Sequence, residues 1–287
     1  MPNDVFSLLV QEQLPSHCAP TSLSACLAVL GIDASQREIA RAAGKPFAIY
    51  DAGLDEHEIK KAAVAFGARC TFLLETDRRQ GPSFAEKLRS HLRRGLPAVV
   101  VVWDFAHWVS CLCYLDDKDK FVVMDPTDND AAFRRRSERK FLAEAWNNSD
   151  DDEEPSQFFA ILVERADGRP AKWKVSRAYL DLCAKGSANT ADQMAKDLRE
   201  VARRAGGSGD DVPLESVLEQ HREGIVDAVD YWTAQTKIKK AELRELLEDF
   251  EVVAAAAGLR IPSDANHAAV VAQMTTIVAT YAWMGEL

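Results

Sequence analysis

The sequence contains no run of apolar residues long enough to cross a membrane. Residues 1–10 include Asp4 and have no basic flank, so we expect no secretory signal. Basic residues are the minority charge, because 35 Lys and Arg stand against 45 Asp and Glu, which gives a net charge of −10. A chain without a basic field does not attract phosphate backbones. We therefore expect neither a nucleic acid nor a membrane as a partner.

Cysteine is also scarce, with 6 residues in a chain of 287. The cysteines are irregularly spaced, unlike the disulfide framework of a small secreted domain. No CxxC or HxxxH spacing offers a zinc site. The acidic run 150–154 lacks the glycine turn and the ligand spacing of a calcium loop, so we expect a solvated loop there. The composition indicates a reducing, cytoplasmic protein with free thiols, no metal and no other cofactor.

What the chain does have is the composition of a globular protein, with 47% hydrophobic and 28% charged residues. Its length favours two domains over one. Helical and strand patterns alternate over residues 1–166, and only helical periodicity follows the segment 166–170 (ADGRP). We therefore predict an α+β domain over residues 1–166 and an all-α helical bundle over 167–287.

The periodicity and the turn residues predict the individual elements. A helix follows Cys18 and ends at Gly31, and Ser35 is placed to cap the next one. The other helices of the first domain are expected at 36–43, 56–66 and 83–94, and its strands at 70–74, 97–103, 107–115, 121–125 and 157–164. Helices of the second domain are expected at 173–185, 188–205, 213–235, 238–257 and 263–284, with a flexible glycine-rich link at 205–209.

Cys18 is the first candidate for chemistry, in the stretch 17–23 (HCAPTSL). Pro20 suits a first helical turn, where its missing N–H is no loss. A thiol at a helix N-terminus faces unpaired N–H groups and the positive end of the helix dipole, which favour the thiolate. The pattern is typical of a nucleophile. The alternative is a packing role, since cysteine is among the most buried residue types.

His107 is the best-placed base for such a nucleophile, because it opens a predicted strand after the tight connection 104–106. Asp125 ends the neighbouring strand. If the polar loop between the two strands is centred on Asp117, residue 109 lies opposite residue 125, and the two side chains share a face. A register that differs by one residue would place them on opposite faces.

The remaining histidines have simpler interpretations. We expect His57 and His91 in solvent, and His221 at the edge of the helical core. His17 adjoins the cysteine, but neighbouring residues on an extended segment point apart. Asp104 is the alternative to Asp125 as the partner of the His107 ring.

The chain carries Cys18, His107 and Asp125 in this order, at a helix start, a strand start and a strand end. In this it resembles the papain-like bacteriocin-processing, or double-glycine, peptidases (cysteine peptidase family 39), as a soluble relative without their transporter. The resemblance covers most of residues 5–165. It is carried by a Gln shortly before Cys18, the helix start at 18–23, Gly53-Leu54, the run 97–100, 107–109 (HWV) and 123–126 (VMDP). It implies a papain-like fold in which N-terminal helices pack on an antiparallel sheet. It also implies Cys18 as nucleophile, His107 as general base and then acid, Asp125 as orienting carboxylate and Gln13 as oxyanion donor.

The chain departs from that family at two positions. Ala19 stands where the family usually has Gly. Glu12 stands six residues before the cysteine, the usual place of the glutamine, so Gln13 is a shifted choice and Gln11 a rival. The absent transporter leaves the double-glycine specificity without support.

The resemblance favours a cysteine peptidase that cleaves a peptide or protein substrate through an acyl-enzyme. Acyl transfer or glutamine deamidation uses the same residues, because these reactions share the intermediate. An inactive papain-like module that binds a partner is the non-enzymatic alternative. The helical domain offers a surface for substrate, for a protein partner or for self-association, or it serves only to stabilise its neighbour.

Overall fold

Short apolar runs separated by polar turns form one antiparallel sheet in the first part of the chain. The computed structural model describes residues 5–9, 11–127, 133–149, 155–169, 173, 175–186, 188–232 and 238–284. Within them the strand order is β1-β7-β2-β3-β4-β5, with β6 paired to β7. The strands are β1 Ala68–Glu75, β2 Ala98–Val102, β3 His107–Leu115, β4 Lys120–Met124, β5 Phe133–Arg136, β6 Trp146–Asn147 and β7 Gln157–Arg165.

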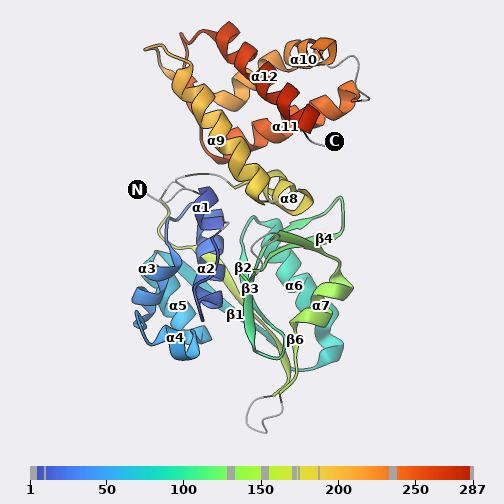
Figure 1. The fold of residues 1–287 in the computed structure, drawn as a ribbon. Helices are drawn as coiled ribbons and strands as arrows, with labels where there is room; N and C mark the ends of the chain where they lie inside the picture. Colours follow the sequence, from blue (N-terminus) through green and yellow to red (C-terminus); the bar gives the residue numbers. More distant parts are fainter. Residues whose placement is uncertain are drawn as a thin grey trace. The chain divides into compact units, whose positions relative to one another are not determined.

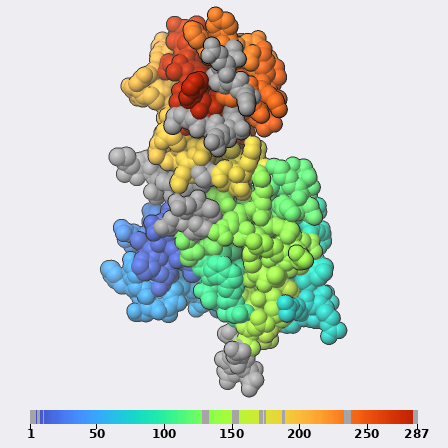
Figure 2. Space-filling model, turned by 45° about the vertical axis from the view of Figure 1, so that its right-hand side comes forward, coloured from blue at the N-terminus to red at the C-terminus, as the bar shows by residue number. Residues whose placement is uncertain are grey.

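Helices cover both faces of this sheet (Figure 1). On one face lie α2 and α5, accompanied by α1, α3 and α4, and on the other lie α6 and α7. In the space-filling view of Figure 2, the green part of the chain, which includes β2, β3 and β4, lies between the blue part that includes α3–α5 and the cyan part that includes α6. The helices are α1 Val5–Leu9, α2 Cys18–Val29, α3 Gln36–Ala43, α4 Ile49–Ala52, α5 Glu56–Ala65, α6 Gly81–Arg93 and α7 Glu138–Ala145, with a short 3₁₀ turn at Arg78–Gln80.

Helix α2 is buried on every side, from Ala19 to Ala28, whereas the sequence pattern predicted a single packed face. Small Ala, Ser and Thr side chains let the helix approach the sheet closely. Ser22 Oγ donates to the carbonyl of Trp108 at 2.9 Å, and Ser110 Oγ donates back to the carbonyl of Ser22 at 2.8 Å. These bonds satisfy buried polar groups and hold the start of α2 against β3.

Most of the predicted elements are confirmed within one or two residues. Helix α3 has the predicted bounds, and Ser35 caps it in a capping box with Glu38. Strand β3 also has the predicted bounds. The elements α1, α4, α7, β5 and β6 were not predicted. All but α7 have five residues or fewer, too few to show a periodic pattern. The acidic run 150–154 lies outside the described residues.

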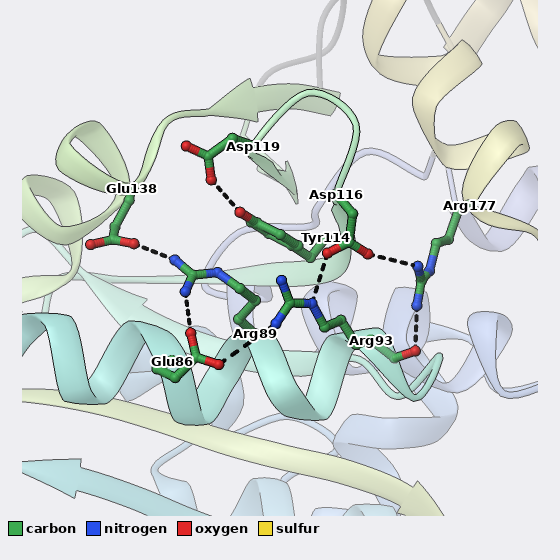
Figure 3. A network of polar contacts seen from close by, with 8 residues as sticks. All are labelled: Glu86, Arg89, Arg93, Tyr114, Asp116, Asp119, Glu138 and Arg177. Carbon is green, nitrogen blue, oxygen red and sulfur yellow. Dashed lines mark hydrogen bonds and ion pairs between the residues drawn. The ribbon is translucent and has the colours of Figure 1, made fainter.

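The chain divides into two compact units, Met1–Asn189 and Thr190–Leu287, whereas the sequence pattern predicted a domain boundary after residue 166. The reason is α8 (Arg177–Lys185), which packs against β3, β4 and β5. Arg177 pairs with Asp116 at 3.2 Å and donates to the carbonyl of Arg93, as Figure 3 shows. Asp181 accepts from Arg135 Nε at 2.6 Å and pairs with Lys118. These contacts tie α8 to the sheet of the first unit.

The second unit is mainly helical, as predicted, and its helices are α9 Ala188–Arg204, α10 Leu214–Trp232, α11 Lys240–Ala256 and α12 His267–Met284. One addition is a two-stranded sheet of β8 (Asp211–Pro213) and β9 (Arg260–Pro262). Helix α12 begins after Asn266, which accepts from the N–H of Ala269, rather than at Ser263. The link at 205–209, expected to be flexible, is bonded to the carboxylate of Asp264 through the N–H groups of Ser208 and Gly209.

The predicted apolar stripe of α11 is buried in this second unit, from Leu243 to Val253. In the part of the chain that the structure describes, we find no helix with both the length and the apolar character that a bilayer span needs.

Candidate active site

Cys18 is the first residue of α2, and its thiol is partly exposed. Burial raises the pKa of this thiol, but hydrogen bonds from the His107 side chain and the backbone N–H of Trp108 outweigh burial and lower the pKa below its ordinary value. The backbone N–H of Ala19 acts in the same direction. Cys18 is therefore poised to ionise more readily than an ordinary cysteine.

All six cysteines are free thiols, and the other five are buried. Burial raises the pKa of Cys70 to about 11 and the pKa of Cys113 and of Cys183 to about 12. It also raises the pKa of Cys26 and of Cys111. Cys18 thus differs from every other cysteine of the chain in the direction of its pKa shift, which is the electrostatic mark of a reactive thiol.

The His107 ring donates from Nε2 to Asp125 Oδ1 at 2.9 Å, and both side chains are buried. Burial lowers the pKa of His107, but the bonds to Asp125 and Cys18 outweigh it and raise the pKa to about 9. Burial raises the pKa of Asp125, but bonds from His107 and Thr127 outweigh it and lower the pKa to about 2. Because Asp125 occupies Nε2, Nδ1 is the ring nitrogen available to the thiol. The arrangement favours a thiolate beside an imidazolium.

The pairing of β3 with β4 brings His107 and Asp125 to one face of the sheet. Near the loop, Leu115 lies opposite Lys120, whereas the predicted register, centred on Asp117, would place it opposite residue 119. A bulge between Cys111 and Cys113 corrects the shift, so that Ser110 lies opposite Met124. Continued by one residue, this register sets residue 109 opposite residue 125, as predicted.

A strained turn leads into His107. Trp103, Asp104 and Phe105 have φ angles of 58°, 56° and 64°, in the left-handed region. This conformation costs non-glycine residues roughly 1–2 kcal/mol each. The turn places the half-exposed Trp103 ring in a stack on the His107 ring, with centroids 4.9 Å apart and planes at 12°. One face of the imidazole is therefore covered by the indole.

Two asparagines hold this turn in place. The fully buried Asn147 accepts from the N–H of Phe105 at 3.0 Å, and its amide donates to the carbonyls of Val101 and Ala145. The N–H of Asn148 donates to Asp104 Oδ1 at 2.7 Å, so Asp104 is not the partner of the histidine. Sequence reasoning missed both the Trp103 stack and this clamp. The one available signal was the adjacent Asn pair, a residue type that favours turns.

The two candidate glutamines lie in different environments. Gln13 donates its backbone N–H to the carbonyl of Pro126 at 3.3 Å, beside Asp125. Its side-chain Oε1 is buried without a hydrogen-bond partner in the described part of the chain. By contrast, Gln11 Nε2 donates to the carbonyl of Leu8 at 2.9 Å and to Ser24 Oγ at 2.6 Å. Gln11 is thus a structural tie between α1 and α2.

The segment that carries Gln13 is fixed by Gln36, a buried residue of α3. Gln36 Oε1 accepts from the N–H of Leu14 at 2.9 Å, and Nε2 donates to the carbonyl of Glu12 at 2.8 Å. One side chain therefore holds the backbone on both sides of Gln13.

The other histidines of the first unit make no hydrogen bond to His107 or Asp125 in the described part of the chain. His17 is buried, donates from Nδ1 to the carbonyl of Pro15 at 2.7 Å, and packs its ring 5.0 Å from that of Tyr50. His57 is exposed, as expected. The expectation that His91 is in solvent is wrong, because its Nε2 contacts the carbonyl of Pro97 at 3.1 Å and burial lowers its pKa.

In the second unit, His221 is half-buried, with its ring 5.7 Å from that of His267. Across the described ranges, no three His, Cys, Asp or Glu side chains gather as metal ligands.

Comparison with known proteins identifies the region that holds these residues. The model of the Peptidase_C39 like family matches residues 4–153. The peptidase domain of Streptococcus ComA, a bifunctional ABC transporter of a quorum-sensing pathway, is 14% identical, with a TM-score of 0.39 over 55% of this chain and 97% of that one. A double-glycine-motif protease from an AMS/PCAT transporter, solved with the leader peptide, is 14% identical, with a TM-score of 0.38 over 55% and 90%. No curated protein matches the chain.

Proposed function

Because the chain belongs to the Peptidase_C39 like family, we propose that it is a cysteine peptidase acting on a peptide or protein through Cys18, His107 and Asp125. The observation that carries the proposal is the contact of the His107 side chain with the Cys18 thiol on one side and with Asp125, at 2.9 Å, on the other. These contacts lower the pKa of the thiol and raise the pKa of His107 to about 9. A thiolate held next to an imidazolium is the reactive form of a cysteine nucleophile.

In this mechanism, the Cys18 thiolate attacks the carbonyl carbon of the scissile bond. The imidazolium of His107 then gives its proton to the departing amine as the C–N bond breaks, which leaves a thioester on Cys18. Neutral His107 next takes a proton from water, and the resulting hydroxide attacks the thioester, which releases the acyl group as a carboxylic acid and restores the thiolate beside the imidazolium. Asp125 holds the ring orientation and stabilises its charged form throughout.

The negative oxygen of the tetrahedral intermediate needs donors, and the start of α2 supplies one. The N–H of Cys18 is among the first of the helix, which have no partner inside it. We assign the second donor to the side-chain amide of Gln13. Ala19 stands at the position where the resembled family usually has Gly. It is fully buried in α2, and the helix begins at Cys18 with this alanine in its first turn.

Mass spectrometry of diverse peptides incubated with the protein tests the proposal. Peptide cleavage that requires the Cys18 thiol supports it. Products joined to another amine, or glutamine amides converted to carboxylates, would instead assign acyl transfer or deamidation.

Iodoacetamide labelling near pH 6 should modify Cys18 much faster than the five buried cysteines. Equal labelling of all six would point to a binding module without an active thiol.

Replacing Gln13 tests the oxyanion assignment. Gln13→Ala should lower kcat by about a hundredfold with little change in KM, because a donor of this kind acts mainly in the transition state. The melting temperature should stay close to that of the wild type. Gln11→Ala is the matched control and should lower the melting temperature while leaving kcat nearly unchanged. The opposite pattern would transfer the role to Gln11.

A further inference from the structure

A pocket of about 250 Å³ lies where α4 and the start of α5 meet the ends of three interior strands of the sheet. It is smaller than pockets that enclose whole drug-sized ligands, and its volume suits one long side chain. Its wall is formed by the ends of β2, β3 and β7 and by the start of α5. The lining residues are Ala52, Leu54, Asp55, Glu56, Val101, Phe105, Trp108, Gln157 and Phe159.

The pocket lies next to Cys18. Trp108, one of its walls, follows His107 directly, and its backbone N–H hydrogen bonds to the Cys18 thiol. On the other side, Gly53 lies between the lining residues Ala52 and Leu54. A Cβ on Gly53 would lie 3.4 Å from the carbonyl of Ser16, two residues before the cysteine. One wall of the pocket thus adjoins His107 along β3, and the other approaches the segment that leads into Cys18.

The chemistry of the lining selects a cation. Phe105, Trp108 and Phe159 supply aromatic rings, and the last two meet edge to face with centroids 6.1 Å apart. Asp55 and Glu56 add two carboxylates, and no Lys or Arg is among the lining residues. Aromatic faces attract an ammonium or guanidinium group, and carboxylates add charge-assisted hydrogen bonds. The apolar stem of such a side chain packs against the rings.

We propose that this pocket, named here the cation pocket, binds a Lys or Arg side chain of the substrate close to the bond that is cleaved, given the peptidase activity proposed above. Glu56 is the better-placed charge, because Asp55 Oδ1 caps α5 at the N–H of Glu58 at 2.8 Å, whereas Glu56 Oε1 makes a looser contact of 3.6 Å with the exposed His57 ring. The pocket accordingly acts as a specificity-determining site.

Thiol-reactive probes test the pocket without any knowledge of the substrate. A cationic reagent, 2-aminoethyl methanethiosulfonate, and an anionic one, 2-sulfonatoethyl methanethiosulfonate, are compared for their rates of reaction with Cys18. Asp55→Asn combined with Glu56→Gln should lower the cation-to-anion rate ratio by about tenfold. Glu56→Gln alone should lower it in part. Asp51→Asn, which removes an exposed carboxylate outside the pocket, should leave the ratio nearly unchanged.

Peptides that differ only in Lys or norleucine, scanned across the cleavage site, separate the two proposals. A preference for Lys at one position, lost in Glu56→Gln and kept in Asp51→Asn, supports the cation pocket. Equal cleavage of the Lys and norleucine peptides at every position would contradict the cation pocket and leave the peptidase proposal standing. If no peptide is cleaved but the reagent ratio falls in the pocket variants, the peptidase proposal fails and the cation pocket stands. A cation-to-anion rate ratio that is the same in the wild type and in every variant would contradict the cation pocket.

Discussion

Cys18→Ala is expected to reduce peptide cleavage by about a thousandfold or more, with little change in the melting temperature. The thiol is the proposed nucleophile, and no neighbouring group can replace it in forming the thioester. Its side chain is partly exposed at the start of α2, so removing the sulfur leaves no closed cavity. Cleavage followed by mass spectrometry and thermal unfolding measure the two effects.

Cys26→Ala is the matched control, because it lies eight residues further along α2 and is fully buried. Its truncation leaves a small cavity and should cost about 1 kcal/mol of stability while activity is kept. Turnover that persists in Cys18→Ala, with an equal loss of melting temperature in both variants, would mean that Cys18 serves packing rather than chemistry.

His107→Ala is expected to lower kcat by about a thousandfold and to change how the reactivity of Cys18 depends on pH. In the wild type, the hydrogen bond from His107 helps to lower the pKa of the thiol, and the pKa of His107 itself is raised to about 9. Alkylation of Cys18 should therefore persist to lower pH than alkylation of an ordinary cysteine. Without His107, burial dominates and the thiol pKa rises, so the rate near pH 6 should fall by at least tenfold.

The pKa shifts of His107 and Asp125 predict how their hydrogen bond contributes to the stability of the fold at each pH. The folded-state pKa of His107 is raised from 6.5 to about 9, so its contribution is complete below pH 6.5 and is lost as the pH rises through 9. The pKa of Asp125 is lowered from 3.8 to about 2, so its contribution is present above pH 3.8 and is lost as the pH falls through 2. The loss of melting temperature in His107→Ala should accordingly be largest between about pH 4 and 6.5 and shrink in alkaline solution.

His91→Ala controls for the removal of a buried imidazole. Its ring bonds to the carbonyls of Pro97 and Val163, away from Cys18. This variant should lose stability and keep the acid reactivity of the cysteine. Unchanged alkylation near pH 6 in His107→Ala would show that the helix start alone activates the thiol, and the assignment of His107 would then fall.

The sequence by itself determined the local structure and singled out three candidate residues for the site. The capping box of Ser35, the apolar pattern of β3 and the start of α2 are local features, and local propensity and periodicity decide them. The same features placed Cys18 at a helix start and His107 and Asp125 on paired strands. Whether His107 and Asp125 share a face of the sheet depended on the register of their strands, and the sequence left two registers open.

The tertiary structure decided whatever depends on contacts between distant segments. The loop register alone would have put His107 and Asp125 on opposite faces, and the bulge between Cys111 and Cys113 reversed that outcome. Gln13 and Gln11 became distinguishable only through bonds to Pro126 and Ser24. The stack of Trp103 on His107, the cation pocket and the place of α8 depend in the same way on groups brought together by folding. Neighbours in sequence set propensity, whereas register, burial and charge pairing are set by neighbours in space.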